Sequence, residues 1–423
     1  MDELVDALLR PDAWPFPVTS VEHLETHISH LFLVEGFVYK VKKPVDLGFL
    51  DFSTLEKRRF YCDEELRLNS RMAPGLYLAR VQIVRDERGF HVEGEGEAVE
   101  YAVKMRRFDQ SCLFDRLPLG DGHIDALAER VAAFHAALPP APEEAEWGRP
   151  EKVWFPMEQN FRQIRELGLF PELAGRLERL QERALQAFEA LRPWLWRRRA
   201  QGWIRECHGD MHLGNIAWVE GEVMVFDGIE FNADLRWIDT ANDIAFLLMD
   251  LERRGMERLA WRFLNRYLER TGDYEGVPLL AFYKGYRAMV RAKVAAIRLI
   301  QEGPGSEGTK QEFADYLEYA EQCLEPAGRP GLCITFGLSG SGKSHFCREL
   351  REQLGLIHLR SDLERKRLFG LAPEADSRSA VEGGIYTPEA TEQTYGRLEE
   401  LAGMLLKAGY SVVVDATFLE AAR

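Results

Sequence analysis

The sequence predicts a two-lobed α+β domain followed by an α/β domain with a parallel sheet, and three observations support this fold class. Up to about residue 110, strand-like alternation surrounds one helical segment. Residues 123–323 carry mostly helical periodicity, which one loop and a short hairpin interrupt. After the proline- and glycine-rich segment CLEPAGRPG, residues 323–331, short apolar strands alternate with helices, as is typical of a parallel sheet.

Size and composition exclude several classes of protein. The chain has 423 residues, which at roughly 150 residues per domain indicates two or three domains. A net charge of −15 argues against a broad nonspecific nucleic-acid surface. The six cysteines are scattered without a CxxC pair, so we expect reduced thiols rather than a zinc ribbon or a disulfide framework. The first residues lack the basic start and apolar core of a signal peptide, and no apolar run is long enough to span a bilayer, so we expect a cytoplasmic protein without a membrane partner.

The small lobe, about residues 20–110, begins with a predicted hairpin. In HLFLVEGFVYKVKKPV, β-branched and aromatic residues flank a Glu-Gly turn, and Lys40 and Lys42 share one face of the second strand. The following segment, STLEKRRFYCDEELRLNSRM, has helical periodicity, and Ser53 with Glu56 has the spacing of a capping box. EAVEYAVKMRRF is a further predicted strand.

The helical lobe, about residues 111–325, contains the motif HGDMHLGN, from His208 to Asn215. Alternating histidine and aspartate on a strand would face one side, as metal ligands often do, so a zinc site is one interpretation. The alternative is a phosphoryl-transfer loop, in which Asp210 accepts the proton of an acceptor hydroxyl and Asn215 binds magnesium. Asp227, at the end of the β-rich run EVMVFD, would be the second metal ligand, and this complete set favours the second interpretation.

Phosphoryl transfer also requires a strand lysine to hold the phosphates of ATP and a helix glutamate to orient that lysine. The small lobe supplies VYKVKK followed by CDEELRLN. Lys40 is the predicted lysine, with Lys42 the alternative on the same face. Glu65 is the predicted glutamate, with Glu64 the alternative. We expect His208 to brace the loop by hydrogen bonding.

Two further groups of polar residues in the helical lobe are interpreted as structural. Asp239 and Asp243 lie on a probable helix, where they could brace the catalytic loop. The basic run from Arg197 to Arg199 lies beside two tryptophans, which could stack on nucleic acid. A solvated helix end with packed tryptophans is the favoured interpretation of this run.

GLSGSGKS, from Gly337 to Ser344, matches the phosphate-binding loop G-x-x-x-x-G-K-[ST] at every fixed position. A predicted strand precedes it and a helix begins within it. Backbone N–H groups would face the phosphates of ATP, Lys343 would reach the terminal phosphates, and Ser344 would bind magnesium. The loop residues predicted to bind the nucleotide are Gly337, Ser339, Gly340, Ser341, Gly342, Lys343 and Ser344.

Two other segments complete the prediction for this domain. Asp415 ends the apolar run SVVVD, where a second magnesium-organising acid is expected. In LRSDLERKRL, Asp362 and Arg365 would share a helix face, so the acid could accept a hydroxyl proton while the arginine holds phosphate. A solvated first helical turn is the alternative for this pair.

These motifs resemble two known families. HGDMHLGN matches the HGDxHxxN loop of the aminoglycoside phosphotransferase family, and FDGIEF resembles its following metal-binding segment. The resemblance implies a kinase-like fold that uses ATP and Mg²⁺. The first lobe has no GxGxxG phosphate cover, and ETHISH, residues 25–30, is a candidate for the loop that faces the phosphates.

GLSGSGKS, SDLER and VVVDATF resemble small P-loop kinases of the gluconate kinase, zeta toxin and polynucleotide 5′-kinase group. In these relatives the residues that match Asp362 and Arg365 handle the acceptor hydroxyl. The whole chain resembles bifunctional proteins in which a phosphotransferase-like domain, here residues 1–325, precedes a P-loop domain, here residues 331–423. Such P-loop domains usually continue further, so we expect this one to be incomplete at its C-terminus.

The expected function is transfer of a phosphoryl group from ATP to a hydroxyl of a small-molecule acceptor, with magnesium as the second cofactor. A nucleotide-sensing regulatory protein is one alternative. A nucleic-acid 5′-hydroxyl kinase, acting through the C-terminal domain, is the other, and nucleic acid is the less favoured partner. The sequence identifies neither the acceptor nor the oligomeric state.

Overall fold

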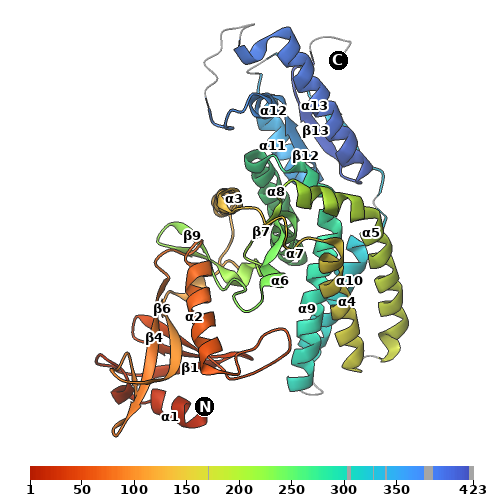
Figure 1. Ribbon diagram of the computed structural model, residues 1–423. Coiled ribbons are helices and arrows are strands. Elements are labelled where there is room, and N and C mark those ends of the chain that lie inside the picture. Colours follow the sequence, from red (N-terminus) through yellow and green to blue (C-terminus); the bar gives the residue numbers. More distant parts are fainter. Residues whose placement is uncertain (170, 303–305, 327, 339–340, 376–383, 419–423) are drawn as a thin grey trace. The chain divides into compact units, whose positions relative to one another are not determined.

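The computed structural model describes residues 1–169, 171–302, 306–326, 328–338, 341–375 and 384–418. The chain forms two compact units (Figure 1), of which the first comprises residues 1–119 and 206–238 and the second comprises residues 120–205 and 239–423. The loop and hairpin that interrupt the helical pattern therefore cluster with the strand-rich lobe. The domain boundaries proposed from the sequence stay a prediction.

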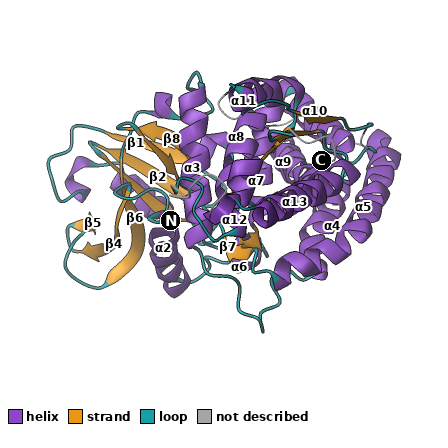
Figure 2. Cartoon of the chain, turned by 90° about the horizontal axis from the view of Figure 1, so that it is seen from above, coloured by secondary structure: helices purple, strands orange, loops and turns teal. Residues whose placement is uncertain are grey.

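An antiparallel sheet of six strands forms the scaffold of the first unit, with the helix α2 (Leu55–Asn69) packed against it (Figure 2). The strand order is β1-β2-β3-β6-β4-β5. The hairpin predicted around the Glu-Gly turn is confirmed, because β2 and β3 pair in register on either side of it. The strands are β1 (Val21–Glu25), β2 (Ser29–Val34), β3 (Phe37–Lys42), β4 (Tyr77–Asp86), β5 (Gly89–Val92) and β6 (Ala98–Arg106).

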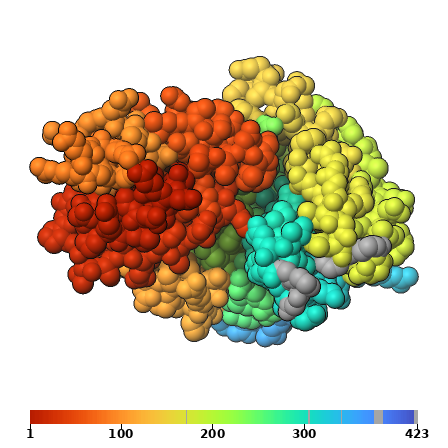
Figure 3. All heavy atoms as spheres, turned by 90° about the horizontal axis from the view of Figure 1, so that it is seen from below, coloured from red at the N-terminus to blue at the C-terminus, as the bar shows by residue number. Residues whose placement is uncertain are grey.

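The two faces of this sheet have different partners. Phe32, Tyr39 and Val41 pack on one face with Leu8 and Trp14, which belong to the N-terminal segment containing α1 (Asp2–Leu8) and the 3₁₀ turn η1 (Pro11–Ala13). Figure 3 shows these N-terminal residues, in dark red, lying on the strand-rich part of the first unit. Because side chains alternate along a strand, the neighbours of Tyr39 and Val41 on β3 point to the other face, toward α2.

Helix α2 begins one residue later than the predicted cap implies. Thr54, rather than Ser53, is the N-cap, and its hydroxyl accepts a hydrogen bond from the backbone N–H of Lys57 at 3.3 Å. Ser53 instead donates its hydroxyl to Asp51 at 2.5 Å. Adjacent hydroxyl residues make both positions plausible caps in the sequence, and the contact with Asp51 decides between them.

The remaining elements of the first unit surround the predicted catalytic loop. The strands β8 and β9 form an antiparallel hairpin, and the 3₁₀ turn η4 precedes it directly. The short strands β7 and β10 carry the chain between the units. These elements are η2 (Gln110–Cys112), β7 (Ile204–Glu206), η4 (Leu213–Asn215), β8 (Ile216–Val219), β9 (Glu222–Val225), α6 (Ala233–Arg236) and β10 (Trp237–Asp239).

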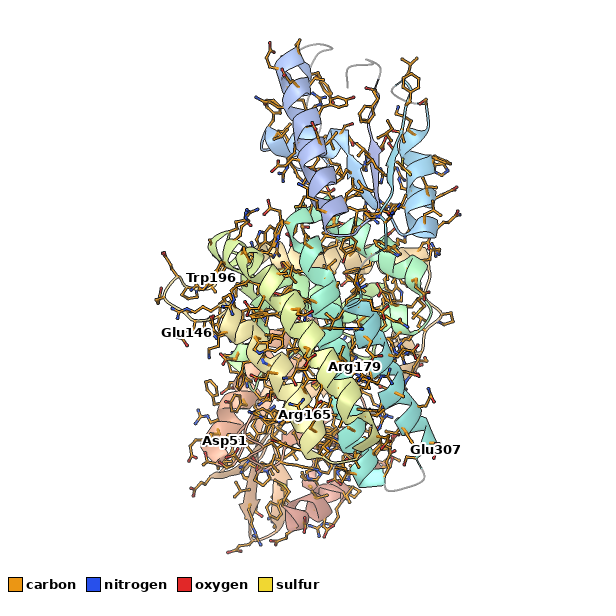
Figure 4. All side chains as sticks on the ribbon, turned by 90° about the vertical axis from the view of Figure 1, so that its right-hand side faces the viewer. Asp51, Glu146, Arg165, Arg179, Trp196 and Glu307 are labelled. Carbon is orange, nitrogen blue, oxygen red and sulfur yellow. The ribbon has the colours of Figure 1, made fainter. Side chains whose placement is uncertain are left out.

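Helices build most of the second unit, as the sequence predicts for residues 123–323. Figure 4 shows α5, which carries the labelled Arg179 and Trp196, running beside α4, which carries Arg165. The core lies between α4, α5, α7, α9 and α10. The elements are α3 (Asp121–Ala137), α4 (Pro150–Glu166), η3 (Pro171–Leu173), α5 (Ala174–Ala200), α7 (Thr240–Arg253), α8 (Glu257–Thr271), η5 (Tyr274–Leu279), α9 (Leu280–Glu302) and α10 (Glu307–Cys323). Within the described part of the chain, each helix is too short or too polar for a membrane crossing.

A buried ion cluster near the end of α5 corrects one interpretation of the sequence. Arg198 is fully buried rather than solvated, and its guanidinium contacts Asp239 at 2.6 Å and Asp273 at 2.5 Å. The basic run therefore contains a core residue, which a helix-end pattern does not reveal. The structural interpretation of Asp239 and Asp243 agrees with their burial.

The C-terminal part of the second unit contains a parallel sheet, as predicted. Its described strands have the order β11-β13-β12, with β13 in the centre. The elements are β11 (Leu332–Ile334), α11 (Lys343–Leu354), β12 (Ile357–Arg360), α12 (Ser361–Leu368), η6 (Gly384–Tyr386), α13 (Pro388–Lys407) and β13 (Val412–Asp415).

Candidate active site

Two lysines of β3 and one glutamate of α2 form the centre of the candidate site in the first unit. Lys40 and Lys42 point to the same face of the strand, toward α2. Lys40 Nζ lies 2.9 Å from Glu65 Oε1, and Lys42 Nζ lies 2.6 Å from Glu65 Oε2. Glu65 thus bridges the two lysines, and each of its carboxylate oxygens contacts one of them. Glu65 and Lys42 are fully buried, whereas the Lys40 side chain is 11% exposed.

The neighbouring glutamate has different partners. Glu64 accepts two hydrogen bonds from Arg67, each of 2.8 Å, and lies 3.3 Å from Arg236. It points away from both lysines. The structure therefore brings Glu65, and not Glu64, to the lysine pair.

The segment FDGIEF supplies two more carboxylates. Lys40 Nζ donates to Asp227 Oδ1 at 2.7 Å, and Lys42 Nζ donates to Glu230 Oε1. Asp227 was predicted as a site residue, and Glu230 was missed. The sequence contains one indication of Glu230. If both lysines of β3 are buried, their charges require more than one carboxylate nearby.

Lys40 and Glu65 hold each other in the ionised state. Burial by itself would lower the pKa of Lys40, but Asp227, Glu65 and Glu230 raise it well above its ordinary value. Burial by itself would raise the pKa of Glu65, but Lys40 and Lys42 lower it to about 2. Burial does raise the pKa of Glu230, despite the nearby Lys42.

Asp227 has an unusual backbone conformation. Its φ is +59°, in the left-handed region that residues with a Cβ adopt rarely. The Tyr77 hydroxyl accepts a hydrogen bond from the backbone N–H of Asp227 at 3.0 Å, and Asn69 Oδ1 accepts one from the next N–H, that of Gly228, at 2.7 Å. These two polar side chains, which the sequence analysis did not identify, hold the strained turn in place. Strain of this kind is concentrated at functional sites.

The predicted catalytic loop is joined to the Asp227 segment by hydrogen bonds. His208 Nε2 lies 2.9 Å from the carbonyl oxygen of Phe226, and His208 Nδ1 accepts a hydrogen bond from the N–H of Asp210 at 3.3 Å. The N–H of Phe226 donates to the carbonyl oxygen of Asn215 at 3.0 Å. His208 therefore braces the loop, as expected.

Asn215 orients the predicted base. Its Nδ2 donates to Asp210 Oδ2 at 3.1 Å and to the carbonyl oxygen of Asp210 at 3.0 Å. The Asp210 side chain remains 35% exposed. Because the side-chain nitrogen of Asn215 donates to Asp210, the side-chain oxygen Oδ1 of Asn215 is the atom left for a cation.

Gly209, between the histidine and the base, is required by its surroundings. Its φ is +84°, and a Cβ added there would lie 2.8 Å from the carbonyl oxygen of Leu235. A larger residue would move the loop and, with it, Asp210. In the HGD motif, glycine is thus required for steric reasons and aspartate for chemical reasons.

The zinc interpretation of the motif does not fit the geometry. His208 uses both ring nitrogens for backbone contacts, and His212 Nδ1 accepts from the N–H of Gly214 at 3.1 Å. Among the residues that the structure describes, neither histidine belongs to a group of three potential metal ligands. Oxygen ligands are available instead: the Asp227 side chain is 48% exposed, and Asn215 offers a carbonyl. An all-oxygen donor set suits Mg²⁺.

The P-loop of the second unit is described only in part, because Ser339 and Gly340 lie outside the described residues. Gly337 and Gly342 have φ values of +137° and +86°, and Gly342 is the N-cap of α11. Lys343 Nζ donates to the carbonyl oxygens of Gly337 and Leu338 at 2.9 and 2.6 Å, and lies 3.5 Å from Ser341 Oγ. The ammonium group therefore lies inside the loop.

The two predicted magnesium ligands of the P-loop region lie on elements that pack together. Ser344 lies in the first turn of α11, which packs against β13, and Asp415 ends that strand. Burial by itself would raise the pKa of Asp415, but His358 and Ser344 lower it. A hydroxyl and an ionised carboxylate are suitable ligands for Mg²⁺.

Asp362 and Arg365 lie three residues apart on α12, which begins at Ser361 as their prediction required. Asp362 pairs with Arg360 at 2.9 Å and is exposed, whereas Arg365 is buried. Arg365 donates to the carbonyl oxygen of Ile385 at 2.9 Å and to Thr391 at 3.1 Å. The role of this pair toward an acceptor stays a prediction.

Comparisons with known proteins agree with the two-part organisation. Residues 92–280 match the family described as "Phosphotransferase enzyme family", and residues 332–423 match the family described as "AAA domain". An uncharacterized protein of Mycobacterium tuberculosis is 31% identical over 415 residues, which cover 95% of this chain and 80% of that relative. An uncharacterized protein of Mycobacterium bovis has the same identity and coverage.

Among solved structures, an amicoumacin kinase in complex with AMP-PNP, Ca²⁺ and Ami is 14% identical, with a TM-score of 0.47, covering 76% of this chain and 94% of that one. A choline/ethanolamine kinase family protein from Mesorhizobium loti is 11% identical, with a TM-score of 0.46, covering 77% of this chain and 95% of that one. The chain belongs to the family of kinase-type phosphotransferases in which an aminoglycoside phosphotransferase-like domain precedes a P-loop kinase-type domain.

Proposed function

We propose that the first unit transfers the γ-phosphoryl group of ATP to a hydroxyl group of a small-molecule acceptor. One observation carries this proposal: Lys40 Nζ lies 2.9 Å from Glu65 and 2.7 Å from Asp227, on three segments far apart in the sequence. This is the arrangement that phosphoryl transfer requires of a phosphate-binding lysine, its orienting glutamate and a metal-binding aspartate.

In the proposed mechanism, Lys40 binds the phosphates of ATP and Glu65 holds its ammonium group in place. Lys42 is fully buried, which supports Lys40 as the lysine that meets the nucleotide. Asn215 and Asp227 would hold Mg²⁺, which supplies positive charge to the transferring phosphates. Asp210 accepts the proton of the acceptor hydroxyl, and the hydrogen bond from Asn215 Nδ2 keeps its carboxylate in position.

Transfer of label from ATP tests this proposal. The chain is incubated with γ-labelled ATP, Mg²⁺ and separate pools of sugars, aminoglycosides and 5′-hydroxyl oligonucleotides. Asp210→Asn should lower transfer to a small-molecule acceptor by roughly 10²- to 10⁴-fold while ATP still binds. Asp63→Asn is a matched control, because Asp63 is exposed on α2, where it pairs with Arg80. Unchanged transfer by Asp210→Asn would refute the role of this residue.

We propose that the second unit provides a separate site for ATP and Mg²⁺, with Lys343 on the phosphates and Ser344 and Asp415 as metal ligands. The packing of α11 against β13 favours this function, because Ser344 lies in the first turn of that helix and Asp415 ends that strand. Lys343→Ala should remove one nucleotide-binding site while label transfer by the first unit continues. Equal nucleotide stoichiometry in the parent chain and Lys343→Ala would count against it.

A further inference from the structure

Helix α8 covers the outer edge of β12 in the second unit. β12 lies at one edge of the three described strands, so its outward-facing backbone groups need partners. Asn265 of α8 supplies both: its Nδ2 donates to the carbonyl oxygen of Leu356 at 2.9 Å, and its Oδ1 accepts from the N–H of His358 at 2.8 Å. Asn265 is only 1% exposed. A side chain of the helical lobe therefore pairs with the P-loop sheet as a further strand would.

A second contact from α8 reaches the same histidine through an arginine. Glu269, on α8, accepts a hydrogen bond from Arg351 Nη1, and Arg351 Nη1 also lies 3.2 Å from His358 Nδ1. The three residues are 4%, 3% and 1% exposed. Burial by itself would raise the pKa of Glu269, but Arg351 lowers it, so the pair is ionised.

This chain of contacts fixes the tautomer of His358. A guanidinium group can only donate hydrogen bonds, so His358 Nδ1 must accept, and a neutral His358 carries its hydrogen on Nε2. Nε2 is buried, lies 3.4 Å from Asp415 Oδ2 and makes no ordinary hydrogen bond within the described residues. The carboxylate of the predicted magnesium ligand therefore lies beside this buried N–H group.

The same geometry decides against a transition-metal site. Cys347, His358 and Asp415 are buried, and their ligand atoms lie within 4.8 Å of one another, as in a potential metal site. A metal at Nε2 would need the lone pair of that atom, which requires Nδ1 to carry the hydrogen. Arg351 disfavours that tautomer, because its own N–H group faces Nδ1.

We propose that His358 positions Asp415 for magnesium, and that Arg351 and Glu269 set the orientation of His358. Through this series the helical lobe completes the nucleotide site of the P-loop domain. His358 is a positioning residue, since it acts through Asp415. The inference rests on the proposed P-loop nucleotide site, and it adds that this site depends on α8.

Binding of a fluorescent ATP analogue to the full chain, with Mg²⁺ and with EDTA, tests this proposal. The P-loop component of binding is defined as the part that Lys343→Ala removes. His358→Leu should weaken this component roughly 10- to 100-fold in Mg²⁺, as loss of a residue that supports a metal ligand does, and leave it unchanged in EDTA. His358→Gln should restore most of the affinity, because its amide keeps a donor near the position of Nε2.

Two variants at the contact between α8 and the P-loop domain separate positioning from general stability. Glu269→Gln weakens the hold on Arg351 and should lower the Mg²⁺-dependent affinity in the same direction. Glu352→Gln is the matched control: Glu352 is also buried and pairs with Arg258 and Arg262 of α8, whereas its neighbour Arg351 is the residue of α11 that contacts His358. Glu352→Gln should leave the Mg²⁺-dependent affinity unchanged, even if it lowers the melting temperature as much as Glu269→Gln does.

Different results would contradict the positioning role of His358 and the P-loop nucleotide site. Equal effects of His358→Leu and His358→Gln, equal losses in Mg²⁺ and EDTA, or equal effects of Glu269→Gln and Glu352→Gln would overturn the positioning role. Absence of any Lys343-dependent binding in the parent chain would overturn the P-loop nucleotide site itself, together with this inference.

Discussion

Replacing Glu65 by Gln tests the electrostatic centre of the candidate site. The carboxylate is fully buried and bridges two lysines, and its pKa is lowered from 4.5 to about 2. At about 1.36 kcal/mol for each unit of pKa, the ionised carboxylate stabilises the fold by about 3 kcal/mol. This agrees with the ~3–5 kcal/mol that is typical when one partner of a buried ion pair is removed.

The sign of the pH dependence follows from the direction of this pKa. Because the folded-state value lies below the ordinary value, the stabilisation is complete above about pH 4.5 and is lost as the pH falls through about 2. The difference in stability between the parent chain and Glu65→Gln should therefore be about 3 kcal/mol at pH 7 and about 1 kcal/mol smaller at pH 3.5.

Amide hydrogen exchange in β3 and α2 measures this difference, because it reports the opening free energy of these elements without a two-state transition of the whole chain. Glu64→Gln is the control: Glu64 pairs with Arg67, whose side chain is 47% exposed, and with Arg236, which keeps Glu206 as a partner, so its loss should cost about 1 kcal/mol or less. Equal destabilisation by Glu64→Gln and Glu65→Gln, or a difference that grows as the pH falls, would contradict the bridging role of Glu65.

Three further predictions concern the loop and the core. His208→Ala should lower the rate of label transfer by roughly 10- to 100-fold, because it removes the brace between the catalytic loop and the Asp227 segment, and a transfer assay at saturating ATP measures it. Gly209→Ala should destabilise the first unit by about 1–3 kcal/mol and lower transfer, whereas Gly221→Ala, with a similar φ of +86° and open space around its Cβ, should leave transfer unchanged. Arg198→Met should destabilise the second unit by about 3–5 kcal/mol in hydrogen exchange of α5, since two buried carboxylates lose their partner, whereas Arg197→Met should cost less than about 1 kcal/mol.

The sequence predicted those parts of the site that local periodicity and motif spacing determine. Lys40 and Lys42 share a face because side chains alternate along a strand, and the glycine turn identified their hairpin. HGDMHLGN and the following aspartate identified the catalytic loop, because phosphoryl transfer requires those residue types in that order. Predictions of this kind need no knowledge of contacts between distant segments.

The residues that the sequence did not reveal depend on such distant contacts. Glu230 meets Lys42 and Tyr77 meets Asp227 only after the sheet, α2 and the hairpin have packed together. Arg198 looked solvated because a basic helix end usually is, and only its two distant carboxylates bury it. Arg365 lies on the same helix as Asp362, as periodicity predicted, but its hydrogen bond to the carbonyl oxygen of Ile385 in η6 depends on a distant segment.

Equilibrium binding of a fluorescent ATP analogue to a Lys343→Ala chain, in which the P-loop is disabled, tests the nucleotide site of the first unit. We expect this chain still to bind the analogue in a Mg²⁺-dependent manner, and we expect the addition of Asp227→Asn to weaken this binding at least about tenfold, since it removes a metal ligand. Loss of all binding in the Lys343→Ala chain, or identical Mg²⁺ dependence with and without Asp227→Asn, would contradict a phosphotransfer site built from Lys40, Glu65 and Asp227.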